Sequence, residues 1–370
     1  MASRVIVYDP TVKDEQSKVR GVGRYLQTMH ENLPEFSYVS EISKIAKDSI
    51  FINPFFSMIQ WPLAFHKVAA RQIAVIHDLI PLKYPQHFPI GLKGKFYRLL
   101  NGFLLSNYDL IVTDSIESKK SIIAYLKIPE NHIKVIYPTV PHLFLPHLDQ
   151  NSKGHEPFHK FEGHSVADFS GMSNNALIEH QDLKNLENYI IYVGDATWNK
   201  NLLNFMQAVK MANLTCVCVG KVFKTDETQL RKKPHPWQKM LYTFLKQITN
   251  DRRFIIPGFI SDTELFALYK KAKVNVLVSF DEGFGLSFIE ASFAGTPSIL
   301  SDTPIFREIA KDAAVFVNPQ DPKNIAQKIS ELYYDNMTNE TMRIKAFSRA
   351  QDFNPPLFRN QWIEAIQKLS

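Results

Sequence analysis

The sequence predicts an α/β protein made of two Rossmann-like, doubly wound domains that face each other across a central cleft. Short apolar runs typical of strands alternate with segments of helical spacing over residues 1–140, and again over residues 189–342. A polar stretch with little periodicity, residues 141–188, separates the two blocks and indicates a linker with an insertion. The length of 370 residues also suits two domains of about 150 residues each.

Apolar spacing predicts the elements of the first block. It indicates a helix at 23–33, and Ser115 starts a second helix at 115–126. Short apolar runs predict strands at 4–8, 72–76, 110–113 and 133–136. Because these strands alternate with helices, we expect a parallel sheet with right-handed crossover connections.

The second block shares this architecture without repeating the sequence. Strands are predicted at 189–194, 215–219, 254–257, 274–279 and 297–300, and helices at 201–212, 262–271, 286–294 and 322–334. The tail, residues 343–370, indicates two helices that are broken at the Asn-Pro-Pro segment 354–356. An apolar stripe in this tail, which includes Trp362 and Ile366, must pack against another part of the chain.

The composition is that of a soluble globular protein, with 45% apolar and 22% charged residues. It excludes general disorder and a disulfide-dense secreted module. The net charge of +6 suits an anionic substrate, nucleic acid or an anionic membrane surface, and does not choose among them. The two cysteines, Cys216 and Cys218, share one apolar run and are expected to be buried, reduced thiols.

No segment is predicted to span a membrane. The most apolar candidate, residues 51–65, is too short and is interrupted by Pro54 and Pro62, and the N-terminus lacks a signal-peptide pattern. We therefore expect a cytoplasmic protein. Peripheral contact with an anionic membrane at its inner face stays open.

The segment 279–297 carries the strongest functional signal. Its glycine-rich turn, Glu282 to Gly285, follows a predicted strand and opens a predicted helix. Such a turn lets the backbone approach a ligand, and free amides at a helix start bind phosphate or sugar hydroxyls. Glu290 lies in that helix, where a carboxylate can accept two ribose hydroxyls. The alternative is that Glu282 favours the helix start and Glu290 is solvated.

The pattern Glu-Gly-Phe-Gly-Leu-x-x-x-Glu over 282–290 resembles the Glu-x7-Glu signature of a known family. These are the retaining, nucleotide-sugar-dependent glycosyltransferases of family 4, or group 1, which have the GT-B fold. The resemblance covers nearly the whole chain. Further segments that resemble family motifs, in the family's order, are 21–25, 77–81, 192–201 and 257–262. The broken C-terminal helices resemble those that cross back to the first domain.

The resemblance implies a first domain that binds the acceptor, a second domain that binds the donor, and roles for individual residues. The implied catalytic residues are His77, Lys200 and Glu282. The implied donor-binding residues are Gly21, Gly23, Gly194, Lys200, Phe259, Glu282, Gly283, Phe284, Gly285 and Glu290. From the residues alone, an ordinary glycine loop at 21–23, a core histidine at His77 and a solvated Lys200 stay open, and Asp78 is expected to hold its turn.

A phosphate site needs positive charge, and Lys200 at a predicted helix start supplies one point charge. Many family members carry an arginine nearby, but the matching positions here are Asp195 and Asn199. Either Lys200 acts with backbone amides alone, or Lys221 or Arg24 supplies a second charge. The chain has no Asp-x-Asp motif, so we expect no metal site and a metal-independent reaction without a cofactor.

The resemblance implies retaining transfer of a hexosyl group, of mannose or glucose type, in surface polysaccharide synthesis. The donor would be a GDP- or UDP-linked sugar, and the acceptor a hydroxyl of a glycan or a lipid-linked glycan. One alternative is a nucleotide-sugar epimerase with the same two-domain plan. The other is a nucleic-acid-binding protein, which we do not expect because the basic residues are scattered rather than gathered in an aromatic-interleaved stripe.

Overall fold

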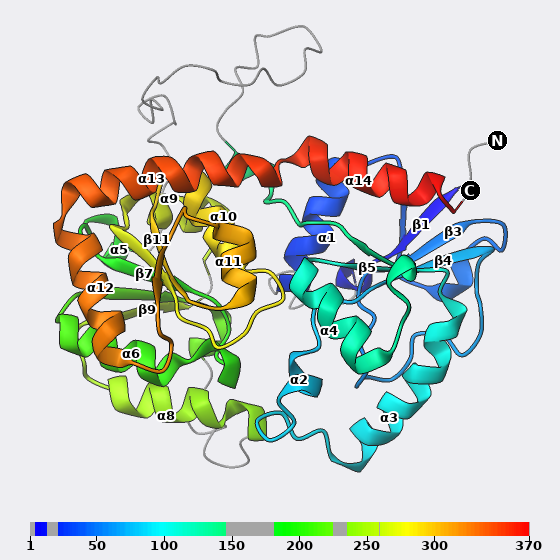
Figure 1. Cartoon of the computed structure of the whole chain (residues 1–370), viewed down its shortest axis with the longest axis horizontal. Coiled ribbons are helices and arrows are strands. Elements are labelled where there is room, and N and C mark those ends of the chain that lie inside the picture. Colours follow the sequence, from blue (N-terminus) through cyan, green and yellow to red (C-terminus); the bar gives the residue numbers. More distant parts are fainter. Residues whose placement is uncertain (1–3, 13–20, 146–180, 225–234, 259, 370) are drawn as a thin grey trace, which may run out of the picture.

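The computed structural model describes residues 4–12, 21–145, 181–224, 235–258 and 260–369. These residues form two α/β domains that lie side by side, with helices covering the sheet of each domain (Figure 1). Each sheet is six-stranded in this part of the chain, and its neighbouring strands are parallel. The predicted fold class is confirmed.

The N-terminal sheet has the strand order β2-β1-β3-β4-β5-β6. Its strands are β1 (Val5–Tyr8), β2 (Ser37–Val39), β3 (Ile50–Asn53), β4 (Arg71–Val75), β5 (Leu110–Thr113) and β6 (Ile133–Val135). The helices are α1 (Gly21–Asn32), α2 (Ile80–Lys83), α3 (Gly91–Leu104) and α4 (Ile116–Leu126). The central strands are buried, as expected of parallel strands covered on both faces.

Several features of this domain differ from the sequence-based expectation, and strand β2 is one that was not predicted. Helix α1 begins at Gly21, so Gly21 and Gly23 lie in its first turn rather than in a loop before it. Helices α2 and α3 were not predicted. Proline residues interrupt the sequence around α2. Four large apolar residues of α3 face solvent, while Leu100 and Leu104 are half-buried.

The C-terminal sheet has the strand order β12-β11-β10-β7-β8-β9. Its strands are β7 (Ile190–Val193), β8 (Cys216–Val219), β9 (Phe254–Gly258), β10 (Val274–Leu277), β11 (Ser298–Ser301) and β12 (Val315–Val317). The helices are α5 (Gln181–Lys184), α6 (Leu202–Ala212), α8 (Lys239–Ile248), α9 (Asp262–Lys271), α10 (Leu286–Phe293), α11 (Pro304–Ala310) and α12 (Pro322–Tyr334). Both cysteines are buried and free, as expected.

The C-terminal helices connect the two domains. Helix α13 (Asn336–Ala350) contacts α10 of the second domain, and α14 (Pro355–Gln367) contacts α1 of the first, so together they run across both domains in Figure 1. The break lies where Asn354 caps α14 by accepting a hydrogen bond from the Leu357 amide at 2.8 Å. The apolar stripe of the tail therefore packs on the N-terminal core, where Trp362 is fully buried.

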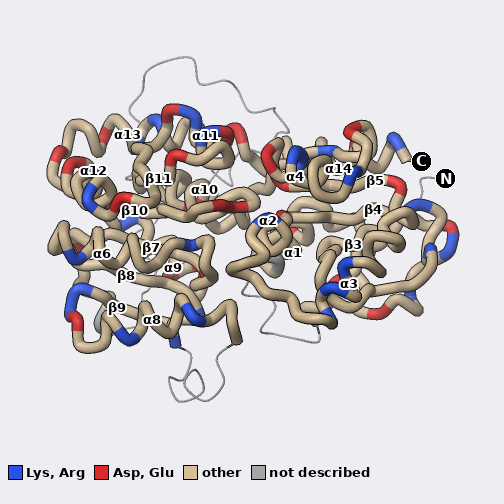
Figure 2. Tube along the Cα trace, turned by 60° about the horizontal axis from the view of Figure 1, so that its bottom comes forward, with Lys and Arg blue, Asp and Glu red and all other residues tan. Residues whose placement is uncertain are grey.

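No helix in the described ranges combines the length and the apolar character that a membrane span requires. Basic and acidic positions are interspersed along both domains (Figure 2). The charge of the chain therefore does not collect into one continuous basic stripe over the described residues.

Replacing Trp362 by Ala should lower the free energy of unfolding by about 3–5 kcal/mol, because a fully buried large side chain is lost from the contact between α14 and the N-terminal core. Denaturant unfolding followed by circular dichroism measures the change. Leu357→Ala is the matched control, because Leu357 is exposed on the same helix and should cost no more than about 0.5 kcal/mol. Equal effects of the two variants would contradict this docking of α14.

Candidate active site

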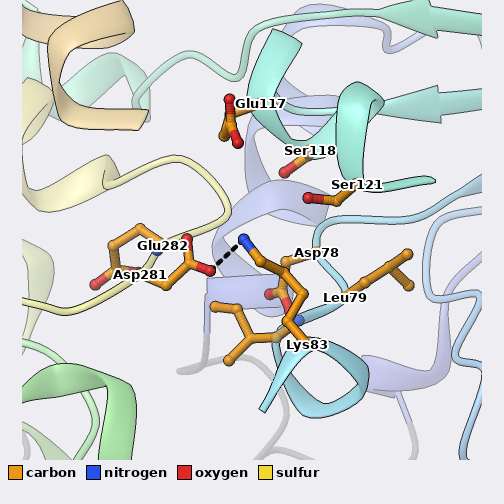
Figure 3. Close-up of a pocket in the computed structure, with 9 residues that line it drawn as sticks. Asp78, Leu79, Lys83, Glu117, Ser118, Ser121, Asp281 and Glu282 are labelled. Carbon is orange, nitrogen blue, oxygen red and sulfur yellow. Dashed lines mark hydrogen bonds and ion pairs between the residues drawn. The ribbon is translucent and has the colours of Figure 1, made fainter. Parts of the chain in front are cut away.

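The candidate site lies where the carboxyl ends of the two sheets face each other. His77 and Asp78 follow β4, Asp114 and Ser115 follow β5, and the segment 279–285 follows β10. Ligands in open parallel sheets bind at this edge. The two domains meet here around a cavity of about 10 Å³, which is room for about one water molecule. Figure 3 shows this cavity with residues of both domains around it.

The glycine-rich turn is fitted closely against the N-terminal domain. A Cβ atom on Gly283 would lie 2.9 Å from the backbone oxygen of His77. The Gly283 carbonyl accepts hydrogen bonds from the Ser115 hydroxyl at 2.9 Å and from the Ser118 hydroxyl at 3.2 Å. Gly285 has a φ of +100°, which only glycine adopts without strain. Glycine at both positions therefore lets α10 begin at the domain interface.

Lys200 and Glu282 form a partly buried ion pair in the C-terminal domain. The Lys200 ammonium lies 2.7 Å from both carboxylate oxygens of Glu282, and the Ser279 hydroxyl donates to Oε1 at 2.7 Å. Burial lowers the pKa of Lys200, but the Glu282 carboxylate outweighs it and holds that pKa above its ordinary value. The alternative of a solvated lysine is wrong.

Arg24 and Glu290 form a second pair, between the domains. The Arg24 Nε atom lies 3.2 Å from Glu290 Oε1, and Tyr269 donates its hydroxyl to Oε2 at 3.2 Å. Arg24 also donates to Asp262 at 2.5 Å. Burial raises the pKa of Glu290, and Arg24 opposes that rise. Glu290 is buried, so the alternative of a solvated carboxylate is wrong.

Of the two residues considered for a second positive charge, only Arg24 lies among these groups. Its guanidinium, from α1, reaches the carboxylate of Glu290 on α10. Lys221 is exposed in a 3-10 turn, Lys221–Lys224, that follows β8. The structure therefore brings Arg24, and not Lys221, to the interface with Glu290.

His77 has a partner at each ring nitrogen. Nδ1 lies 2.6 Å from the Asp114 carboxylate, and Nε2 lies 3.0 Å from the Pro54 backbone oxygen. A carbonyl oxygen only accepts, so Nε2 carries a hydrogen. Burial lowers the pKa of His77, but Asp114 outweighs it and raises that pKa, which favours an imidazolium with both nitrogens donating. His77 is thus not an isolated core histidine.

Further contacts hold the two domains together around the site. Lys83 forms an ion pair with Asp281 across the cavity (Figure 3). The Glu308 carboxylate accepts the backbone amides of Ile116 at 2.7 Å and Glu117 at 3.0 Å, at the start of α4. A carboxylate there also matches the positive end of the helix dipole.

Of the residues considered in the sequence analysis, the remaining ones that the structure describes take part in neither of the two ion pairs described above. Gly194 directly follows β7, where its amide donates to the Val219 oxygen at 3.1 Å. Phe284 is buried against Phe353 with ring centroids 5.4 Å apart, which leaves its backbone rather than its ring for a ligand. Asp78 accepts the Ile80 amide at 2.9 Å and so holds its turn, as expected. Phe259 lies outside the described residues.

The sequence interpretation missed several residues of the interface. Asp114 directly follows a predicted strand, so the rule that ligand sites collect at strand ends could have found it. Trp198 does not follow a predicted strand directly, so the same rule does not find it. Its ring stacks on His87 of the other domain with centroids 3.7 Å apart and on Phe280 at 5.0 Å. Within the described ranges, no group of three or more His, Cys, Asp or Glu side chains could hold a metal ion.

In the NMR spectrum, the His77 ring should titrate above pH 6.5, the ordinary value for histidine, because Asp114 stabilises the imidazolium. Asp114→Asn should bring the pKa below 6.5, because burial then dominates. The signal is identified by its loss in His77→Gln. An unchanged titration in Asp114→Asn would contradict the pairing.

Because folding raises the pKa of His77, the free energy of unfolding depends on pH. The pair contributes its full stability below pH 6.5, the ordinary pKa, and loses it as the pH rises through the folded-state pKa.

Comparisons with known proteins give one family match and several related sequences. Residues 174–349 match the family described as glycosyl transferases group 1. The chain is 26% identical over 288 residues to the O-antigen chain mannosyltransferase RfbU of Salmonella typhimurium, covering 77% of this chain and 66% of that protein. It is 25% identical over 192 residues to the O-antigen chain mannosyltransferase B of Escherichia coli, covering 50% and 46%. The matched regions thus span less than two thirds of either relative.

Two solved structures have the same fold over nearly the whole length. The sucrose-phosphate synthase of Thermosynechococcus elongatus superposes with a TM-score of 0.67 at 16% identity, covering 99% of both chains. HepE of Anabaena, solved in complex with UDP and glucose, superposes with a TM-score of 0.68 at 14% identity, also over 99% of both chains. Residues 174–349 thus match the group 1 glycosyl transferases, and the chain as a whole shares the GT-B fold of the two solved structures.

Proposed function

We propose that the protein transfers a hexosyl group, of mannose or glucose type, from a nucleoside diphosphate sugar to a hydroxyl of a glycan or glycolipid acceptor. The transfer retains the anomeric configuration and serves surface polysaccharide synthesis. The names of the two related mannosyltransferases support the sugar class and the acceptor class. The UDP and glucose in the HepE complex support a nucleotide-sugar donor.

One observation carries the proposal: groups suited to a diphosphate and to a ribose lie at the same interface, each paired with an opposite charge. A donor diphosphate would replace Glu282 beside Lys200, and the first amides of α10 would add hydrogen bonds. Ribose hydroxyls would replace Arg24 at Glu290. Arg24 would then be released from Glu290 and could face the diphosphate from the acceptor domain.

The donor also requires the cleft to open. A cavity of about 10 Å³ between Asp78, Lys83 and Glu282 does not admit a nucleotide sugar. Lys83–Asp281 and the Glu308 contact with α4 are among the interdomain contacts that such opening would break. Binding of the donor is therefore coupled to movement of the domains, as in other enzymes that close around a substrate.

In the proposed reaction, the bond between the anomeric carbon and the diphosphate oxygen breaks, and the acceptor oxygen bonds to that carbon on the same face. The acceptor proton passes to the departing phosphate. Lys200, Arg24 and the α10 amides stabilise the negative charge that develops on the diphosphate, so these groups replace a metal ion. The imidazolium of His77 adds positive charge at the same interface.

Neither alternative function gains support from the matches. The epimerase and the nucleic-acid-binding protein are both absent from the names of the relatives and solved structures described above. The interspersed charges in Figure 2 also lack the continuous basic stripe that nucleic acid would require.

A panel of radiolabelled GDP- and UDP-sugars, each with a glycan acceptor and with excess chelator, tests the function. We expect one donor to yield a glycosylated product with the anomeric configuration retained, at the same rate with and without chelator. Inversion, or conversion of the donor without an acceptor, would refute the proposed reaction. A strict requirement for added Mg²⁺ or Mn²⁺ would refute metal independence.

Replacing Lys200 by Ala should lower kcat by about 100- to 1,000-fold and raise the donor KM much less, because the charge on the leaving group grows in the transition state. Lys200→Arg should restore activity only partly, since a planar guanidinium replaces a point charge. Steady-state kinetics measure both effects.

Lys221→Ala is the matched control, because Lys221 is exposed and lies outside the ion pairs of the site. It should behave like the wild type. Near-normal turnover in Lys200→Ala, together with loss of activity in Arg24→Ala or Lys221→Ala, would assign the main phosphate contact to another residue.

A further inference from the structure

Helix α3 in the N-terminal domain exposes four large apolar side chains to solvent, whereas an ordinary surface helix exposes polar ones. Leu92, Phe96, Leu99 and Phe103 are 85%, 57%, 63% and 70% exposed. Their spacing places them within an arc of about 60° on one face. The buried residues of the helix are Gly94 and Asn101, on the opposite side. Tyr97, Leu100 and Leu104 on the inner side are half-buried, so α3 has apolar residues on both sides. The four large apolar side chains on the outer side are exposed to water, which is unfavourable, so this face fits a non-aqueous partner.

Two aromatic residues outside the helix extend this apolar face. Trp61 is 60% and Phe65 52% exposed, and their ring centroids are 5.4 Å apart. Trp61 also lies 5.6 Å from the ring of Tyr97 on α3. Asn101 anchors the helix beneath by donating to the Gln60 oxygen at 2.8 Å. We call the four exposed residues of α3 with Trp61 and Phe65 the α3 face.

The charge around the α3 face is strongly one-sided. Helix α3 carries three basic residues and no acidic residue, whereas the nearby Lys67, Arg71 and Lys83 are paired with Asp109 or Asp281. Lys93, Lys95 and Arg98 are exposed on α3 itself, where Figure 2 colours basic positions blue. Within the described ranges, none of these three forms an ion pair. The surface therefore combines large apolar side chains with unpaired positive charge.

We propose that the α3 face docks the protein on an anionic lipid surface. A helix of this kind lies in the plane of the interface, with its apolar side at the boundary of headgroups and acyl chains. Long basic side chains at its flanks reach back to the headgroups, and each contributes by attraction to anionic lipid. A second copy of the chain would fit less well, because pairing two such faces would bring their positive charges together.

The position of the α3 face relates this docking to the cleft. His77 and Asp78 at the cleft lead directly into α2, and α3 follows it in the same domain (Figure 1). If the proposed function holds, a lipid-linked acceptor would thus approach from the membrane beside the acceptor domain. Docking itself requires neither donor nor acceptor.

Sedimentation with vesicles tests the proposal on the full chain without any nucleotide sugar. We expect binding to vesicles of phosphatidylcholine with phosphatidylglycerol, and at least tenfold weaker partitioning to phosphatidylcholine alone. Leu92→Ser with Phe103→Ser should weaken binding to the anionic vesicles at least tenfold. Lys93→Gln with Lys95→Gln and Arg98→Gln should do the same and should remove most of the salt dependence.

The matched control is Tyr334→Ser with Met337→Ser, because those side chains are 67% and 79% exposed on the other domain. This variant should bind vesicles like the wild type. Equal loss in the control, or equal binding to neutral and anionic vesicles, would overturn the proposal. So would a dimer, seen by sedimentation velocity without lipid, that only the α3 variants abolish. Transferase activity on a soluble acceptor is measured in parallel. A failure of the proposed transferase function can then be distinguished from a failure of membrane docking.

Discussion

The cleft depends on one electrostatic constraint: charges removed from water must be paired. Lys200 meets this constraint through Glu282, and Arg24 meets it through Glu290. The first pair lies within the C-terminal domain and the second crosses the interface. Each pair joins a cation suited to a diphosphate with a carboxylate that competes for it. Of the two pairs, Arg24–Glu290 therefore also holds the domains together.

The interdomain contacts explain why the chain needs its particular glycines and its C-terminal helices. Gly283 lets its turn touch His77 of the other domain, since a side chain there would meet the His77 oxygen. Helix α14 packs on the N-terminal core while α13 packs on α10. One continuous tail therefore crosses both domains, and its break at Asn354 lies between the part on each domain.

Local patterns of the sequence predict the fold and the glycine-rich turn well. The strands are short buried runs, and the Glu282–Glu290 segment is itself a contiguous motif. The pairing of charges could not be predicted, because Arg24 meets Glu290 from a position far away in the sequence. The partners of His77 likewise come from two other strand ends. Helix α3 was missed because four of its large apolar residues face solvent instead of a core.

The most direct test of this account is calorimetry of UDP and GDP binding to Glu282→Gln, with Lys200→Ala for comparison. A nucleoside diphosphate carries no sugar, so it isolates the phosphate contact. If Glu282 competes with the diphosphate for Lys200, then Glu282→Gln should bind one of the two nucleotides more tightly than the wild type. Lys200→Ala should bind that nucleotide more weakly. Equal weakening in both variants would contradict the account, because Glu282 would then support nucleotide binding instead of opposing it.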